Sequence, residues 1–381
     1  MADAPARRLR VVYALDTFET GGTELNAVRT AERLDRSRFD VRFVCLGERG
    51  PLVSRVRDAG FRIDEFRIGS LVSGSALQQG NRLRRWLRDE RIDVFHAHDI
   101  YSNIWGVPWA RVAGVPLVIA SRRWWTETNR PAHARLNRWS YSIAHRVLAN
   151  SPSVARLVEE EGLAPERVVI IPNFVSDDAF IPPSPGFLDS TRLDLQLEPD
   201  DEVVGVIANF HAIKDLPTML RALARLSPAR PRLRLVLVGD GTERGALVQQ
   251  VESLGLADRV RFAGRRAPMP SLHWLFDVSV LCSRGEGFPN SLVEAMAAAR
   301  PVVATSVGGI PDAVIDGETG VLIDAGDDHA LAAAVGAMLD DPGRREALGR
   351  AGAARARGEF AEVRVITKLE TVYRQLANSA V

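Results

Sequence analysis

Two glutamates in the stretch SRGEGFPNSLVEAMA, residues 283–297, have the type and spacing to hold a polar ligand between them. Glu286 and Glu294 are eight positions apart, slightly over two helical turns, so a continuous helix would place them on one face. Gly287 and Pro289 lie between them, and both oppose a helix. The two acids are therefore expected on either side of a helix start.

The apolar run DVSVLC (277–282) predicts a strand, with Glu286 in the loop beyond its carboxyl end. A helix capped by Asn290 or Ser291 would follow and carry Glu294 about one turn in. Its first free amides, at 290–292, form an anion site at a helix N-terminus. A phosphate flanked by two carboxylates that hold hydroxyl groups matches the parts of a nucleotide sugar. A solvated acidic loop is the alternative.

Glycine turns follow other predicted strands. VGDGTERG (238–245) mimics a dinucleotide fingerprint, but three residues rather than two separate its last glycines, and no acid about 20 residues on completes the pattern. A tight turn at Gly239 and Gly241 that lets backbone approach a ligand is favoured over nicotinamide binding. Gly21 and Gly22 supply a similar loop after the first strand.

Lys214, in NFHAIKD, is one of only two lysines among 49 basic residues. It lies just before a predicted helix, PTMLRALARL, where its point charge could lie over a diphosphate. A surface lysine is the alternative.

Short β-branched strands alternate with amphipathic helices throughout, which predicts parallel sheets covered on both faces. The expected strands are 10–15, 41–46, 93–97, 116–121, 146–150 and 168–172, then 202–209, 232–240, 259–264, 277–282, 301–306 and 320–323. Residues 173–201, rich in prolines and acids, are interpreted as a linker and lead-in, and 344–376 as helices without a following strand. The predicted fold is α/β, two consecutive doubly wound domains, with a site in the cleft where they face each other.

Composition bounds the class of protein. A length of 381 residues favours two domains, and a net charge of +1 gives no argument for nucleic acid. Cys45 and Cys282 each end an apolar run and are predicted to be buried thiols. The first 15 residues hold no apolar stretch of signal-peptide length, and no run of about 18 apolar residues occurs, so a cytoplasmic protein is expected.

The order GGTELN, HAHD, IPNFV, NFHAIKD, VGDG, AGR, SRGEGFPNSLVEAMA, GGIPD and DGETGVL resembles glycosyltransferase family 4, with the two-domain GT-B fold, over nearly the whole chain. The Glu-x7-Glu element is its most specific part. The resemblance implies an N-terminal acceptor-side domain at 1–178, a nucleotide-sugar domain at 179–355, and a C-terminal helix at 356–381 that packs back on the first domain. It also implies a hexosyltransferase of polysaccharide biosynthesis that uses a UDP- or GDP-sugar.

Site residues carried over from the resemblance have distinct expected roles. Glu286 would contact the donor sugar, Glu294 the ribose hydroxyls, and Lys214 the leaving phosphate, while a catalytic histidine is assigned to His98. The donor site would comprise Gly21, Gly22, Asn209, Lys214, Gly239, Gly241, Arg265, Glu286, Gly287, Phe288, Pro289, Asn290, Ser291, Leu292 and Glu294.

The same resemblance implies that transfer retains the anomeric configuration, with the departing phosphate taking the acceptor's proton on the same face. No Asp-x-Asp sequence is present, and Lys214 and the amides at 290–292 could stabilise the diphosphate, so no metal and no other cofactor is expected.

Two positions depart from the family pattern. Ala208–Asn209 stands where many members have Gly-Arg, and Arg265, Arg266 or Arg284 could supply that charge. SRRWW (121–125) stands where many have a histidine near the donor sugar, for which His96 and His98 are nearby candidates.

Arg122, Arg123 and Trp124 are the predicted acceptor residues. From 122 to 146 the chain carries six arginines and one acid, Glu127, with interleaved aromatics. Such a segment could bind a lipid-linked diphosphate at the inner membrane surface, a sugar, or single-stranded nucleic acid, though nothing else supports nucleic acid as a partner. A solvated helix face is the alternative. Glycan, lipid-linked and small-molecule acceptors stay open. The alternative functions are a sugar-nucleotide epimerase or phosphorylase of the same fold, and an inactive nucleotide-sugar sensor or scaffold.

Overall fold

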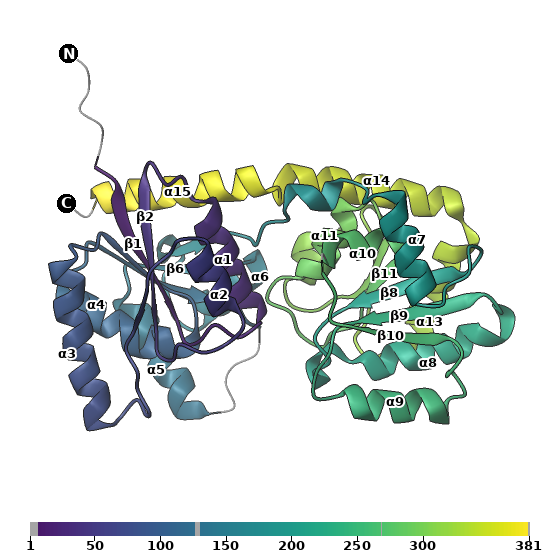
Figure 1. The fold of residues 1–381 in the computed structure, drawn as a ribbon, viewed down its shortest axis with the longest axis horizontal. Helices are drawn as coiled ribbons and strands as arrows, with labels where there is room; N and C mark the ends of the chain where they lie inside the picture. Colours follow the sequence, from purple (N-terminus) through teal and green to yellow (C-terminus); the bar gives the residue numbers. More distant parts are fainter. Residues whose placement is uncertain (1–6, 126–129, 268, 380–381) are drawn as a thin grey trace, which may run out of the picture. The chain divides into compact units, whose positions relative to one another are not determined.

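A computed structural model of the chain describes residues 7–125, 130–267 and 269–379. They form two compact units (Figure 1). The first contains the chain up to Asn173 and resumes at Val363, and the second runs from Phe174 to Glu362. Glu127 lies outside the described residues. No described helix is long and apolar enough to cross a membrane.

The first unit is built on a seven-stranded parallel sheet in the order β3-β2-β1-β4-β5-β6-β7. Its strands are β1 (Leu9–Leu15), β2 (Phe39–Cys45), β3 (Ile63–Glu65), β4 (Val94–Ala97), β5 (Leu117–Arg122), β6 (Arg146–Ala149) and β7 (Val168–Ile170). Its helices are α1 (Gly22–Arg33), α2 (Leu52–Asp58), α3 (Gly74–Asp89), α4 (Val107–Ala113), α5 (Pro131–Ile143), α6 (Pro152–Glu160) and α15 (Glu362–Ser379), and a π-helical turn, Ser102–Gly106, precedes α4.

The second unit has a six-stranded parallel sheet in the order β10-β9-β8-β11-β12-β13. Its strands are β8 (Glu202–Ile207), β9 (Leu233–Val238), β10 (Val260–Gly264), β11 (Val278–Leu281), β12 (Val302–Thr305) and β13 (Val321–Ile323). Its helices are α7 (Pro185–Asp194), α8 (Leu216–Leu226), α9 (Arg244–Ser253), α10 (Met269–Leu272), α11 (Asn290–Ala297), α12 (Ile310–Ala313), α13 (Asp328–Asp340) and α14 (Pro342–Glu359).

The strand order indicates where each sheet can form a ligand-binding crevice. It reverses between β1 and β4 in the first unit and between β8 and β11 in the second. Two loops that leave such neighbours turn to opposite faces, so a crevice opens at the carboxyl ends of the strands. The prediction of two doubly wound α/β domains is confirmed, and these two reversal points are where functional residues are expected.

The interpretation of 173–201 as a linker is wrong for part of its length, because α7 lies inside it. The Ser184 side chain accepts a hydrogen bond from the amide of Phe187 (3.3 Å) and Pro185 takes the first helical position, which together start the helix. Leu195 and Leu197 then enter a buried apolar cluster under β8 and β9. Prolines that suggested a linker thus begin a helix of the second unit.

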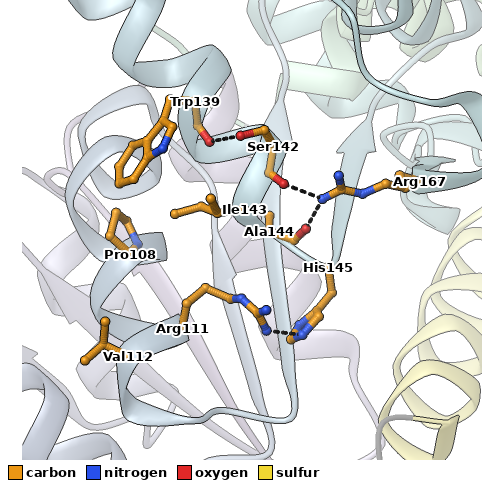
Figure 2. Close-up of a pocket in the computed structure, with 9 residues that line it drawn as sticks. All are labelled: Pro108, Arg111, Val112, Trp139, Ser142, Ile143, Ala144, His145 and Arg167. Carbon is orange, nitrogen blue, oxygen red and sulfur yellow. Dashed lines mark hydrogen bonds between the residues drawn. The ribbon is translucent and has the colours of Figure 1, made fainter.

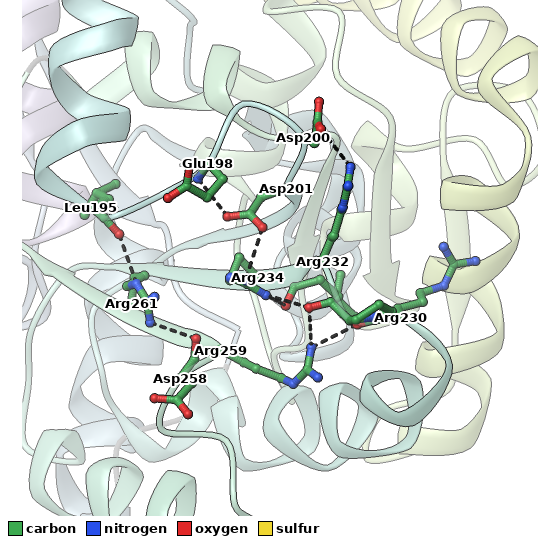
Figure 3. A network of polar contacts seen from close by, with 12 residues as sticks. Leu195, Glu198, Asp200, Asp201, Arg230, Arg232, Arg234, Asp258, Arg259 and Arg261 are labelled. Carbon is green, nitrogen blue, oxygen red and sulfur yellow. Dashed lines mark hydrogen bonds and ion pairs between the residues drawn. The ribbon is translucent and has the colours of Figure 1, made fainter.

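Arginine side chains form ion pairs and hydrogen bonds at the amino ends of the strands in the second unit, as Figure 3 shows. Arg232 pairs with Asp200 (2.8 Å), Arg234 with Asp201 (3.2 Å), and Arg259 donates to the carbonyl of Arg230 (2.9 Å). The carboxyl ends of the same strands lie at the opposite edge of the sheet, where the candidate site is found.

Candidate active site

The turn after β8 positions Lys214. Asp215, the next residue, is left-handed (φ 46°) and buried, and its carboxylate accepts from Thr218 Oγ1 (2.9 Å) of α8. The buried Cys282 thiol donates to the carbonyls of Lys214 (3.4 Å) and Asp215 (3.2 Å). Burial, reinforced by the Asp215 charge, raises the pKa of this thiol to about 12. The thiol therefore acts as a neutral donor that ties the lysine turn to the end of β11.

Glu286 lies in the loop after β11, and its Oε1 forms an ion pair with Lys214 Nζ. Ser283 Oγ donates to the same oxygen (2.7 Å). These residues come from two loops 72 positions apart that meet at the β8/β11 reversal point. Both side chains keep some contact with solvent, 21% for Lys214 and 10% for Glu286, so a ligand can reach the pair.

The end of β12 and the loop that follows it hold the loop of Glu286 in place. Gly309 donates its amide to the Glu286 carbonyl (2.8 Å), and Gly308, at φ +55°, passes so close that a Cβ there would lie 2.1 Å from that oxygen. Thr305, at the end of β12, donates its hydroxyl to the Ser283 carbonyl (2.6 Å). The loop carrying Glu286 is thus held from β12 as well as from β8.

Helix α11 begins at Asn290, but neither Asn290 nor Ser291 caps it as predicted. Pro289 takes the capping position, without a side-chain hydrogen bond, and the Asn290 amide instead donates to the Phe288 carbonyl (3.1 Å). The turn is closed by backbone, and the amides of Ser291 and Leu292 lie in the first turn of the helix, where backbone N–H groups have no intrahelical acceptor. Glu294 is buried on the helix, with 8% of its surface exposed.

The glycine loop after β9 packs against the turn after β8. Gly239 has φ +133°, and a Cβ on it would meet the Ala208 carbonyl at 1.9 Å, while a Cβ on Gly241 would lie 2.4 Å from the Phe210 carbonyl. These glycines are therefore needed for close backbone contact within the unit. Asn209, between those carbonyls, is exposed.

The three arginines considered for the missing charge differ in environment. Arg266 pairs with Asp194 of α7, and Arg265 is exposed. Arg284 donates its amide to the Ile213 carbonyl (2.8 Å), beside Lys214, and its side chain pairs with Asp215 (3.0 Å). Arg284 is thus the arginine that the structure brings next to the lysine turn.

His98 follows β4 in the first unit and is fully buried, yet neither ring nitrogen has a hydrogen-bond partner among the described residues. It stacks on His96 at 4.0 Å and lies 4.5 Å from the Tyr13 ring. Burial, together with His96 and Arg123, holds its pKa well below the usual range. A buried neutral imidazole without partners is unusual in native proteins.

Asp16, directly after β1, joins that strand to the turn after β4. Its carboxylate accepts the amides of Tyr101 (3.2 Å) and Ser102 (2.6 Å), and its own amide donates to Asp99 (3.0 Å). Burial raises the pKa of Asp16 to about 7, and burial together with Asp16 raises that of Asp99 well above its usual range.

Gly21 and Gly22 lie at the start of α1. A Cβ on Gly21 would be 2.1 Å from a Glu24 carboxylate oxygen, and burial raises the pKa of Glu24 as well. The glycine loop therefore adjoins the acids at the β1/β4 reversal point.

The predicted acceptor residues lie at the end of β5. Arg122 is buried, donates to the Trp124 carbonyl (3.0 Å), and pairs with Glu161 (3.4 Å), so its charge is satisfied inside the unit. Arg123 donates to Asn173 (3.0 Å), and burial lowers the pKa of its guanidinium. Burial, together with the Arg123 charge, lowers the pKa of His96 in β4 and of His98 directly after it, whereas Arg122 is not among the causes of either shift.

Sequence reasoning missed Ser283, Gly308 and Asp16 as site-building residues. Ser283 and Gly308 stand inside quoted motifs, but their contacts with Glu286 depend on strand order, which periodicity does not reveal. The signal for Asp16 was an acid directly after the first strand, ahead of a glycine pair.

Comparison with known proteins identifies the family. The family model described as Glycosyltransferase Family 4 matches residues 20–179, and the model described as Glycosyl transferases group 1 matches residues 201–341. The D-inositol 3-phosphate glycosyltransferase of Thermobispora bispora is 32% identical over 309 residues, 75% of this chain and 71% of that protein. The Corynebacterium diphtheriae protein of that name is 29% identical over 306 residues, with the same coverage.

Solved structures agree on the fold. Anabaena Alr3699/HepE in complex with UDP aligns with a TM-score of 0.86 over 96% of this chain and 100% of that chain, at 22% identity. Its complex with UDP-glucose aligns with a TM-score of 0.84 over 97% of this chain and 100% of that chain, also at 22% identity. The family models, the curated relatives and the two Rossmann-like sheets together show that the chain belongs to glycosyltransferase family 4 and is a glycosyltransferase with the GT-B fold.

Proposed function

We propose that the protein transfers a hexose-type sugar from a UDP- or GDP-sugar to an acceptor hydroxyl with retention of configuration and without a metal. The observation that carries this proposal is the Lys214–Glu286 pair at the β8/β11 reversal point, next to the uncapped start of α11. The nucleotides in the Anabaena structures support a UDP-linked donor.

In this proposal the diphosphate lies between Lys214 and the amides of Ser291 and Leu292. The lysine and the helix start both stabilise negative charge as it develops on the leaving group. Glu286 then binds sugar hydroxyls and Glu294 the ribose hydroxyls. Arg284 is the second cation, in place of the arginine absent at Asn209.

The chemical step breaks the bond between the anomeric carbon and the diphosphate oxygen and forms a bond from that carbon to the acceptor oxygen. The departing phosphate oxygen takes the acceptor's proton on the face that it leaves. Attack from that face retains the anomeric configuration. Lys214 balances the charge of the departing nucleoside diphosphate, so the step needs no co-reactant.

The acceptor side is proposed at the β1/β4 reversal point of the first unit, with His98 and Arg123. A neutral, unpartnered imidazole can hydrogen-bond a hydroxyl, and Arg123 favours an acceptor that carries negative charge. The name of the relatives, D-inositol 3-phosphate glycosyltransferase, fits a phosphorylated polyol. Glycans and lipid-linked sugars with a phosphate share that chemistry, and peripheral membrane contact is part of the proposal.

The first experiment is calorimetric titration of EDTA-treated protein with UDP, GDP and ADP. Tight binding of UDP or GDP, weakened by Glu294→Ala, is the expected result. The matching sugar nucleotides are then incubated with and without inositol 3-phosphate, and the products are analysed for anomeric configuration. An inverted product, transfer only after metal is restored, or a sugar-nucleotide change without acceptor would each contradict the proposal. Nucleotide binding without any turnover would favour the alternative function, an inactive nucleotide-sugar sensor.

A further inference from the structure

A pocket of about 630 Å³ lies in the first unit, between α4, α5 and the loop into β6 (Figure 2). His145 lies one residue before β6 and Arg167 one residue before β7, so the pocket is at the amino ends of these parallel strands. Asp16 and His98 follow the carboxyl ends of β1 and β4. The pocket is therefore at the opposite edge of the sheet from the residues proposed for the acceptor.

Two hydrogen-bond donors face each other in this pocket. The Nδ1 atom of His145 accepts the amide of Val118 (2.8 Å), so the proton of the neutral ring must be on Nε2. Arg111 directs a guanidinium nitrogen at that same Nε2, as Figure 2 shows, and a guanidinium only donates. Protonating the ring would leave the donors opposed. An acceptor from outside the chain would satisfy both groups.

The charges around the pocket make that acceptor an anion. Burial and the nearby Arg111, Arg146 and Arg167 lower the pKa of His145 to about 4, so the ring is neutral at pH 7. No aspartate or glutamate is among the described residues that line the pocket. Arg167 donates to the carbonyls of Ser142 and Ala144 at the end of α5 and is held in place by them. The cations are thus positioned without a carboxylate to neutralise them.

Apolar groups form the outer part of the same surface. Val112 of α4 is 58% exposed, and Trp139 and Leu136 of α5 are 48% and 38% exposed. Arg135, on the same helix, is also exposed. A free phosphate ion would make no use of this apolar rim, whereas the surface of an anionic bilayer offers phosphates and apolar chains side by side. Tryptophan is enriched at the interface between membrane and water.

We propose that the pocket binds the phosphate of an anionic lipid head group, with Arg111 and His145 as donors and Trp139 and Val112 in the interfacial layer. The proposed function includes peripheral membrane contact, and this pocket would be the place where that contact is made. It also assigns that contact to the strand edge opposite His98, which leaves the proposed acceptor residues free of the lipid surface.

The test is sedimentation of the full chain with vesicles of phosphatidylcholine, with and without phosphatidylglycerol. The wild-type chain should bind only the anionic vesicles. Arg111→Gln should weaken that binding about fivefold, the effect of one arginine near a charged surface, and Trp139→Ala should weaken it as well. Arg350→Gln, which removes an exposed arginine of α14, is the charge-matched control and should bind like wild type. Equal binding by all four proteins would overturn the proposal.

A second measurement separates lipid from free phosphate. Brominated lipid should quench wild-type tryptophan fluorescence more than that of Trp139→Phe, because that indole would lie at the lipid surface. Inorganic phosphate that binds through Arg111 without any vesicle binding would contradict a lipid ligand. Far-UV circular dichroism and thermal unfolding of each variant show whether it is folded, and UDP or GDP titration shows whether its second unit still binds nucleotide. A variant that binds nucleotide but not vesicles supports the lipid site, and wild-type protein that binds nucleotide but not vesicles refutes it while the proposed transfer stands.

Discussion

Lys214 and Glu286 come from two loops of the second unit and neutralise each other as an ion pair. A lysine has three donor protons, and the Glu286 carboxylate already accepts Ser283. A diphosphate would compete for the lysine, and sugar hydroxyls would compete for the carboxylate. We therefore expect donor binding to divide the pair, so that each charge meets a different part of the ligand.

Replacing each glutamate in turn tests its proposed contact, Glu286 with the sugar and Glu294 with the nucleotide. Glu286→Ala should reduce turnover about 100- to 1,000-fold, as loss of one transition-state contact does, and change nucleotide affinity less than about tenfold. Glu294→Ala removes hydrogen bonds to a charged group and should weaken nucleotide binding about 10- to 100-fold. Steady-state kinetics and calorimetry measure the two effects, with the exposed Glu318→Ala as control. Normal turnover by Glu286→Ala would refute the role assigned to its loop.

Asp16 should make stability depend on pH. Its pKa is about 7 in the folded chain, against about 4 in an unfolded one, so the folded state binds the extra proton between these values. The free energy of unfolding that Asp16 contributes is fully present below about pH 4 and is lost as pH rises from 4 to 7. Because buried histidines act in the opposite direction at acid pH, the measured quantity is the Tm of wild type minus that of Asp16→Asn. This difference should fall between pH 4 and pH 7, and a constant difference would contradict the assignment.

At the scale of elements, the loop after β12 supports the loop after β11. Gly308→Ala would place a methyl group 2.1 Å from the Glu286 carbonyl, so one of the two loops must move. We expect turnover to fall at least tenfold with a loss of about 1–3 kcal/mol in the free energy of unfolding. Gly317→Ala is the control, since that glycine has a similar φ of +73° but open space around it. Equal kinetic losses in the two variants would show that backbone strain, rather than contact with Glu286, is responsible.

Periodicity predicted twelve of the thirteen strands found in the described part of the chain. The strand that it missed, β3, has three residues, two of them acidic, and gives no apolar run. Helix α3 begins at Gly74, where the Ser73 side chain caps it by accepting the Ala76 amide (3.2 Å). Apolar periodicity in the sequence is thus enough to predict that an element forms. Where the element begins and ends depends on capping contacts.

The candidate site residues also differ in how much of their environment the sequence predicts. Residue type and motif predicted Lys214, Glu286 and Glu294, and the structure brings the first two together as an ion pair. The burial of Arg122 could not, because it depends on Glu161 of a later turn coming under β5. An arginine beside tryptophans in sequence is equally compatible with an exposed acceptor site and with a satisfied ion pair, and only the fold distinguishes them.

At the scale of the whole molecule, the last helix is part of the first unit. Tyr373 of α15 donates its hydroxyl to that of Tyr13 in β1 (3.0 Å) and hydrogen-bonds His96 Nδ1 (2.7 Å), while His96 Nε2 meets Ser121 (2.8 Å). His96 in turn stacks on His98. The end of the chain thereby sets the environment of the histidine proposed to contact the acceptor.

Tyr373→Phe removes both hydrogen bonds and leaves His96 Nδ1 buried without its partner. We expect the first unit to lose about 1–3 kcal/mol in its free energy of unfolding, and the acceptor KM to rise more than the donor KM. Urea titration followed by tryptophan fluorescence reports this unit, because six of the seven tryptophans lie in it. Tyr101→Phe is the control, since the Tyr101 hydroxyl has no hydrogen-bond partner among the described residues. Similar losses in both variants would contradict a specific role for Tyr373.

The return of the chain to its first unit also orders events during synthesis. Residues up to Asn173 leave the ribosome first, but the helix that carries Tyr373 is made about 190 residues later. At usual rates of translation that interval is about 10–40 s. During it Tyr13 and His96 have no partner from α15, while the second unit, which is continuous in sequence, can close on itself. The half of the enzyme that is made first is therefore completed last, and a nascent chain carries an unfinished first unit and a finished second unit.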